Sequence, residues 1–82
     1  MIKLIDAHSL GGTLVDLTFS DGAHGVWSGD LLLKRQGPLL EPLRDEEYFK
    51  RFFIEAGALC WPNGLELSPA RLRETALSSL VA

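Results

Sequence analysis

The sequence predicts a single α+β domain over residues 1–82, with helices on one face of a mostly antiparallel sheet. Three observations lead to this class. Apolar and polar side chains alternate over Thr13–Phe19, Asp21-Gly22 separates two strand-like runs, and apolar residues recur at helical spacing after Pro69. The expected order of elements is β-β-β-α-β-β-α.

The first part of the chain predicts a three-stranded meander. Ile2–Ala7 is rich in branched residues and is followed by a turn containing Gly11-Gly12, where glycine accepts a positive φ without a Cβ clash. The alternation in Thr13–Phe19 is typical of a strand with one buried face. Asp21-Gly22 then favours a tight hairpin turn into a third strand over Ala23–Trp27.

The middle of the chain predicts a short helical turn, a connection and a helix. The turn over residues 28–33 should end before Gly37, a helix-breaking residue followed by proline. Pro38–Leu43 is expected to run extended because its two prolines exclude the interior of a helix. Asp45 suits the N-cap of a helix over Glu46–Phe53, whose aromatic residues at i,i+4 spacing would face the sheet.

The last third predicts two strand segments and a terminal helix. Ile54–Trp61 is expected to form one strand bent at Gly57, followed by a brief strand over Leu65–Leu67. Ser68 and Pro69 fit the N-cap and the first position of the helix. The apolar side of this helix consists of Leu72, Ala76, Leu77 and Leu80.

Composition restricts the classes of function. Eleven acidic residues against eight basic ones give a net charge of −3, which disfavours direct binding of nucleic acid. The single cysteine, Cys60, excludes an internal disulfide and favours the reducing cytoplasm. No apolar run is long enough for a signal-peptide core or a membrane span. We therefore expect a cytoplasmic protein with no membrane or direct nucleic-acid partner.

No residue cluster requires a catalytic or metal-binding interpretation. His8 and His24 are expected two strands apart, about 9–10 Å, which is too far for one zinc ion. Asp21 and Asp16 near His24 are better explained by turn and surface chemistry. Cys60 lies in an apolar strand without a nearby cation, so a buried packing role is favoured over a nucleophile. The glycines match no phosphate-binding loop. We expect no catalytic residue, metal or cofactor.

Basic pairs and the terminal helix leave two alternatives open. Lys34-Arg35, Lys50-Arg51 and the pair Arg71 and Arg73 could merge into a basic face, but interspersed acids favour a mixed, solvated surface. The terminal helix either closes the core or docks into a partner or a second copy, and a small domain needs the buried area. The candidate interaction residues on this helix are Leu72, Leu77 and Leu80.

Two motifs carry a resemblance to a known family. Phe19-Ser20-Asp21-Gly22 and Trp61-Pro62-Asn63-Gly64, the latter followed by Leu65–Leu67 and Ser68-Pro69, resemble the domain of unknown function 2442 family, as do Leu39–Leu43 and the helix after Asp45. The resemblance implies a small bacterial α+β domain, often encoded beside another small protein in an arrangement similar to a toxin–antitoxin pair. The matching positions, expected to be mainly structural, are Phe19, Asp21, Gly22, Trp61, Pro62, Asn63 and Gly64.

These observations predict a non-enzymatic protein-interaction or regulatory module, such as the antitoxin-like half of a two-gene pair. A small basic protein encoded nearby would complement the acidic chain. A homodimer is expected as well, because a small core and leucines on the last helix favour a covering partner. The alternative function is a small-molecule or nucleic-acid-linked regulator. No helix-turn-helix is visible, so the resemblance does not extend to DNA binding.

Overall fold

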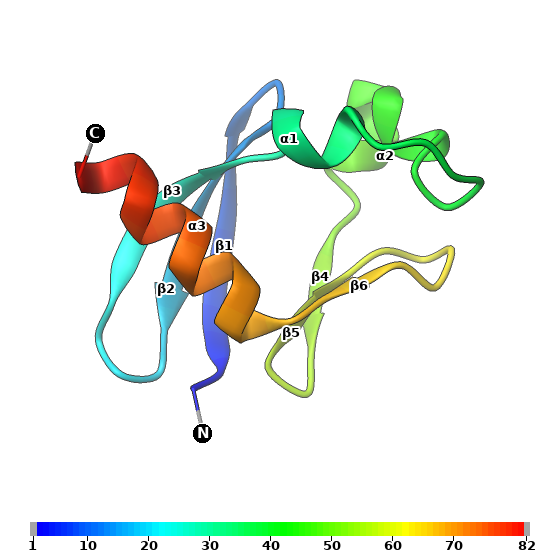
Figure 1. Cartoon of the computed structure of the whole chain (residues 1–82). Coiled ribbons are helices and arrows are strands. Elements are labelled where there is room, and N and C mark those ends of the chain that lie inside the picture. The colour runs from blue at the N-terminus through cyan, green and yellow to red at the C-terminus, as the bar shows by residue number, and fades with distance from the viewer. Residues whose placement is uncertain (1, 82) are drawn as a thin grey trace.

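The computed structural model describes residues 2–81, and it describes the side chains of all of these except Leu31 and residues 77–81. It confirms the α+β class: two three-stranded antiparallel sheets pack with helices (Figure 1). In each sheet the three strands lie side by side in their sequence order. The expected order of elements lacks one strand of the second sheet, and the strands form two sheets where one was expected.

The first sheet is the predicted meander. It consists of β1 (Leu4–Gly11), β2 (Leu14–Phe19) and β3 (His24–Ser28). β1 is longer than expected because positive φ angles at Gly11 (102°) and Gly12 (56°) allow a turn of two residues, so pairing continues to Gly11, which faces Leu14. At the second turn, Gly22 has φ 89° and its amide donates to the carbonyl of Phe19 at 3.0 Å, as expected for Asp-Gly.

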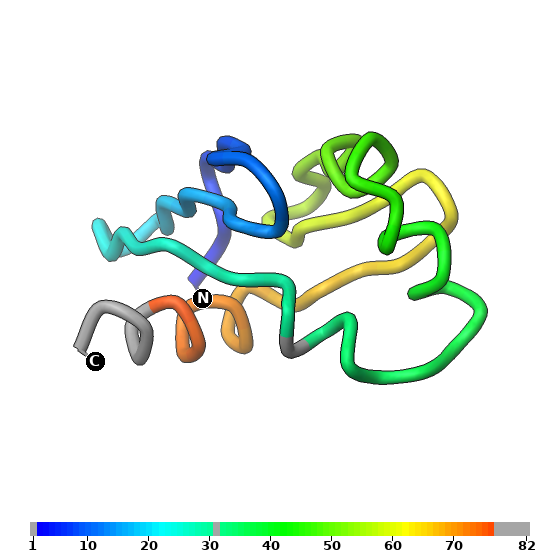
Figure 2. Tube along the Cα trace, turned by 90° about the horizontal axis from the view of Figure 1, so that it is seen from above, coloured from blue at the N-terminus to red at the C-terminus, as the bar shows by residue number. Residues whose placement is uncertain are grey.

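The inner face of the first sheet is covered by the last helix. Val15, Leu17 and Phe19 of β2 have no exposed surface. Helix α3 (Pro69–Val81) runs along this face, contacting β3 and β2 (Figure 2). Its start is as predicted: the amide of Arg71 donates to the Ser68 hydroxyl at 3.3 Å, and Pro69 is the first helical residue.

The connection between the sheets is more compact than predicted. After α1 (Asp30–Leu33), a turn leads into a 3-10 helix, η1 (Pro42–Arg44), and then into α2 (Glu46–Phe49). The prediction that Pro38–Leu43 runs extended was wrong. Pro42 occupies the first position of η1, where the helix does not use a backbone N–H, so the proline fits there. The turn places Leu40 and Leu43 in the interior. α2 is shorter than the predicted Glu46–Phe53, and its N-cap is Asp45 as expected.

The second sheet contains a hairpin that the sequence did not predict. Its strands are β4 (Phe53–Glu55), β5 (Ala58–Cys60) and β6 (Glu66–Leu67). The single bent strand expected over Ile54–Trp61 was wrong, because Ala56 (φ 52°) and Gly57 (φ 81°) form a tight turn that reverses the chain. The carbonyl of Gly57 accepts the amide of Leu4 at 2.8 Å, which ties this hairpin to β1.

An aromatic group joins the two halves of the core. The Phe49 ring stacks on Trp27, with centroids 6.2 Å apart, and packs against Trp61 at 5.7 Å. The indole N–H of Trp61 donates to the Phe49 carbonyl at 2.9 Å. Gly29 lies directly against the Phe49 ring. The core cluster consists of Leu4, Val15, Leu17, Phe19, Trp27, Leu43, Phe49, Leu59, Trp61, Leu72 and Ala76.

Replacing Trp61 tests its role as the anchor of this core. Trp61→Ala should lower the free energy of unfolding by about 3–5 kcal/mol, because a side chain only 1% exposed leaves a cavity. Trp61→Phe should cost less, about 1–3 kcal/mol, since it keeps an aromatic ring but leaves the Phe49 carbonyl unpaired. Urea unfolding followed by circular dichroism measures both. An unchanged midpoint for Trp61→Ala would show that the ring does not anchor the fold.

Two glycines allow a matched test of the close approach at Phe49. A Cβ at Gly29 would lie 2.8 Å from two carbons of the Phe49 ring, whereas a Cβ at Gly37 has no neighbour within 4 Å. Gly29→Ala should therefore destabilise the domain by about 1–3 kcal/mol. Gly37→Ala should be neutral or slightly stabilising, because it only restricts the unfolded chain. Equal melting temperatures for the two variants would contradict this packing.

Candidate functional site

The turn after β5 holds its own conformation and is fastened to the preceding loop. The Trp61 amide donates to the Leu65 carbonyl at 3.0 Å, and the Gly64 amide donates to the Trp61 carbonyl at 3.0 Å. The side chain of Asn63 accepts from the Leu65 amide at 3.1 Å and donates to the Leu39 carbonyl at 2.9 Å. These contacts give Trp61 and Asn63 structural roles. Pro62 and Gly64 are exposed.

A shallow hollow of about 230 Å³ opens beside this turn on the second sheet. Its base is a row across three strands, in which Phe53 pairs with Cys60 and Cys60 pairs with Glu66. Glu55 lies two residues from Phe53 and so shares its face of β4. The residues that line the hollow are Phe53, Glu55, Cys60, Trp61, Pro62, Gly64, Leu65 and Glu66. We name this surface the acidic face.

The acidic face combines an exposed aromatic ring with two carboxylates. Phe53 is 42% exposed, an unusual environment for a phenyl ring in so small a domain. Glu55 and Glu66, on the two outer strands of the sheet, form no ion pair within the part of the chain that the structure describes. An exposed aromatic ring on the same surface as two carboxylates that pair with no described residue suits a cationic side chain with an aliphatic stem.

Cys60 lies at the base of the acidic face as a thiol. It is buried, and its Sγ donates to the Ala58 carbonyl at 3.7 Å. Burial, and then the nearby charges of Glu66 and Glu55, raise the pKa of Cys60 above its usual value. The thiolate that nucleophilic chemistry requires is therefore disfavoured at this position. The packing role expected for this cysteine fits its environment.

The Asp-Gly turn of the first sheet has a structural partner in α3. One carboxylate oxygen of Asp21 accepts from the Ala23 amide at 3.0 Å, and the other lies 2.8 Å from both Nε and Nη2 of Arg73. The Ala23 amide and the Arg73 guanidinium hold the pKa of Asp21 below its usual value. Asp21 therefore fastens the hairpin to the helix that covers the sheet. The expectation from sequence alone had placed Asp21 only in the turn.

The two histidines belong to separate pairs on the outer face of the first sheet. His8 Nε2 lies 2.9 Å from Asp6, on the same strand, and His24 Nε2 lies 2.7 Å from Oδ1 of Asp16. That buried oxygen makes no hydrogen bond of good geometry, so the contact is electrostatic. Within the described residues, no three side chains of His, Cys, Asp or Glu lie close enough to hold a metal ion.

The leucines proposed for interaction separate into two groups. Leu72 is 2% exposed and belongs to the core, so it closes the domain rather than facing a partner. Leu77 and Leu80 lie outside the residues whose side chains the structure describes. Phe19, with no exposed surface, is likewise structural.

Sequence reasoning missed the acidic face because it placed Phe53 in a helix. The i,i+4 spacing of Phe49 and Phe53 fits a helix, but α2 ends at Phe49 with Lys50 as its C-cap, and strand pairing begins at Phe53. The signal that could have revealed the hairpin is the Ala56-Gly57 pair between two strand-like triplets. With that turn recognised, alternation along β4 puts Phe53 and Glu55 on one surface.

The pair of Asp21 and Arg73 predicts a pH dependence. Asp21 has a lower pKa in the folded state than its ordinary value of 3.8. The ion pair therefore stabilises the fold fully above about pH 5, and this stabilisation is lost as the pH falls through the lowered pKa. Asp21→Asn should lower the melting temperature at neutral pH, with a difference from wild type that vanishes in acid. A difference that persists at about pH 2 would contradict the charge-based explanation.

Similarity to known proteins comes from a family model. In the described part of the chain, no helix has the length and apolar character needed to cross a membrane. No curated protein and no solved structure matches the chain. A family model does match, over residues 5–78, and it confirms the resemblance carried by the Asp21-Gly22 and Trp61–Gly64 motifs. The chain belongs to the family described as Protein of unknown function (DUF2442).

Proposed function

We propose that this chain is a non-enzymatic protein-interaction module that binds a basic segment of a partner protein on its acidic face. The carrying observation is that Phe53, 42% exposed, lies on one sheet surface with Glu55 and Glu66, neither of which forms an ion pair with a described residue. A lysine or arginine would lay its stem over the Phe53 ring and place its charge between the carboxylates.

Charge and rigidity support this choice of partner. The net charge of −3 attracts a basic protein at long range and speeds encounter. The acidic face rests on a fixed base, because Trp61 beneath it is held by the Phe49 carbonyl and Asn63 fastens the adjoining turn to Leu39. A preformed surface loses little conformational entropy on binding.

Within this proposal, the partner is a small basic protein encoded beside this chain, and the module is the antitoxin-like, regulatory half of a bacterial, cytoplasmic pair. The homodimer is the less supported mode of association. At the edge of the first sheet, the Ala7 amide donates to the Asp6 carboxylate at 3.0 Å, which occupies a group that a second copy would need for strand pairing.

Calorimetry with the product of the adjacent reading frame tests the acidic face. Wild type should bind, and the double variant Glu55→Gln/Glu66→Gln should bind about tenfold or more weakly, because both carboxylates that attract the cation are neutralised. Phe53→Ala should also weaken binding. The matched control is Glu46→Gln/Glu47→Gln, which removes the same charge from α2 and should bind like wild type at equal ionic strength.

Three outcomes would reject the proposal. The neighbouring protein could fail to bind, the charge-neutral face could bind as tightly as wild type, or both double variants could weaken binding equally. The last result would show a general effect of net charge rather than recognition by this face. Melting curves of each variant confirm that the exposed substitutions leave the fold intact.

A further inference from the structure

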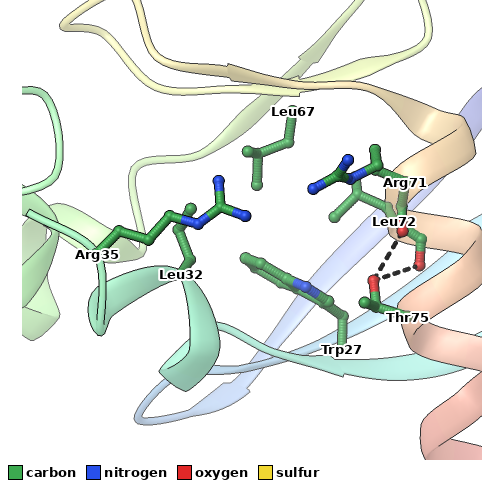
Figure 3. Close-up of a pocket in the computed structure, with 7 residues that line it drawn as sticks. All are labelled: Trp27, Leu32, Arg35, Leu67, Arg71, Leu72 and Thr75. Carbon is green, nitrogen blue, oxygen red and sulfur yellow. Dashed lines mark hydrogen bonds between the residues drawn. The ribbon is translucent and has the colours of Figure 1, made fainter.

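A second pocket, of about 170 Å³, lies between α1, β6 and α3. The indole of Trp27 and the side chains of Leu32, Leu67 and Leu72 give it an apolar lining. Arg35 and Arg71 stand at its sides, and in Figure 3 their guanidinium groups point toward each other across the space next to the Trp27 ring. These arginines come from two basic pairs that are far apart in the sequence.

Among the described residues, the two guanidinium groups have no neutralising partner. Neither forms an ion pair with any residue that the structure describes, whereas Arg44 pairs with Glu41 at 3.4 Å and Arg73 pairs with Asp21 at 2.8 Å. Two like charges that converge on an apolar space repel each other. An anion between them removes this repulsion and accepts the paired hydrogen bonds that a planar guanidinium donates.

The site is held in place by contacts outside the pocket. The Arg35 carbonyl accepts from Nη2 of Arg44 at 3.1 Å, and the Arg71 amide donates to the Ser68 hydroxyl at 3.3 Å. The Trp27 ring is stacked on Phe49 at an interplanar angle of 13°. The backbones of both arginines and the aromatic wall are therefore fixed before a ligand arrives, which favours binding.

Size and polarity define the ligand. A cavity of about 150 Å³ holds one benzene ring, and pockets for larger organic ligands have volumes of about 300 Å³ or more. The pocket thus fits a single ring or a branched aliphatic group and is too small for a whole nucleotide. Its apolar lining disfavours a bare, hydrated inorganic anion, and the net charge of −3 disfavours a polyanion.

We propose that this pocket binds a small free monocarboxylate that carries one ring or one branched aliphatic group. The carboxylate lies between Arg35 and Arg71, and the apolar group lies against Trp27, Leu32 and Leu67. Because Arg35 follows α1 and Arg71 belongs to α3, the ligand links two elements that are distant in sequence. Binding to the folded state therefore raises the melting temperature, and the rise continues with the logarithm of ligand concentration above the Kd.

The test compares acids with their neutral amides on the wild-type chain. Phenylacetate and isovalerate are titrated against phenylacetamide and isovaleramide, and the indole N–H signal of Trp27 is followed by heteronuclear NMR. The acids should bind with a Kd of about 1 mM or tighter, and the amides about tenfold or more weakly. This comparison needs no variant. Acids and amides that bind equally, or no shift of the signal up to about 20 mM, overturn the proposal.

Arginine variants test which guanidinium groups bind the carboxylate. Arg35→Gln and Arg71→Gln should each weaken binding of the acids about tenfold or more. Arg51, an exposed arginine in the turn after α2, provides the control, and Arg51→Gln should bind like wild type. Equal binding by all three variants overturns the assignment. Two further ligands test whether the anionic group comes instead from an inorganic ion or from the carboxy terminus of a peptide. The proposal is also overturned if inorganic phosphate binds as tightly as phenylacetate. It is overturned as well if a peptide with a carboxy-terminal leucine binds about tenfold more tightly than phenylacetate.

Discussion

The domain depends on the contacts of one residue, Phe49. Its ring lies between Trp27 of the first sheet and Trp61, which directly follows β5 of the second sheet, and its carbonyl accepts the Trp61 indole N–H. In an 82-residue chain the core is small, so a single aromatic group that contacts both sheets carries a large share of the buried apolar area. Gly29 lets the chain pass over the ring at a distance that no side chain permits.

The two candidate surfaces are opposite in charge and are both built on this aromatic group. Trp61 forms part of the acidic face, and Trp27 forms a wall of the arginine-lined pocket. The net charge of the chain describes neither surface, because the fold places Glu55 and Glu66 at one of them and Arg35 and Arg71 at the other. The acidic face suits a flexible cationic side chain, and the pocket suits a compact organic anion.

Local signals predicted the parts of the fold that depend on a few neighbouring residues. The Asp21-Gly22 turn, the Asp45 N-cap and the start of α3 at Pro69 were all predicted, because turn and cap chemistry acts within about four residues. Phe53 was misassigned because its spacing from Phe49 fits a helix, and only pairing with Cys60 makes it a strand. The convergence of Arg35 and Arg71 lay beyond sequence reasoning, because it arises when α3 docks on β3.

The sequence separation of the tertiary contacts indicates an order of folding. The ion pair between Asp21 and Arg73 spans 52 residues, and the Trp61 hydrogen bond to Phe49 spans 12. Each hairpin closes a short loop, so the hairpins of both sheets can form early at low entropic cost. Neither can bury its apolar face until Trp27, Phe49 and Trp61 meet. The aromatic group is therefore the folding nucleus that the topology favours, and the docking of α3 on the first sheet follows it.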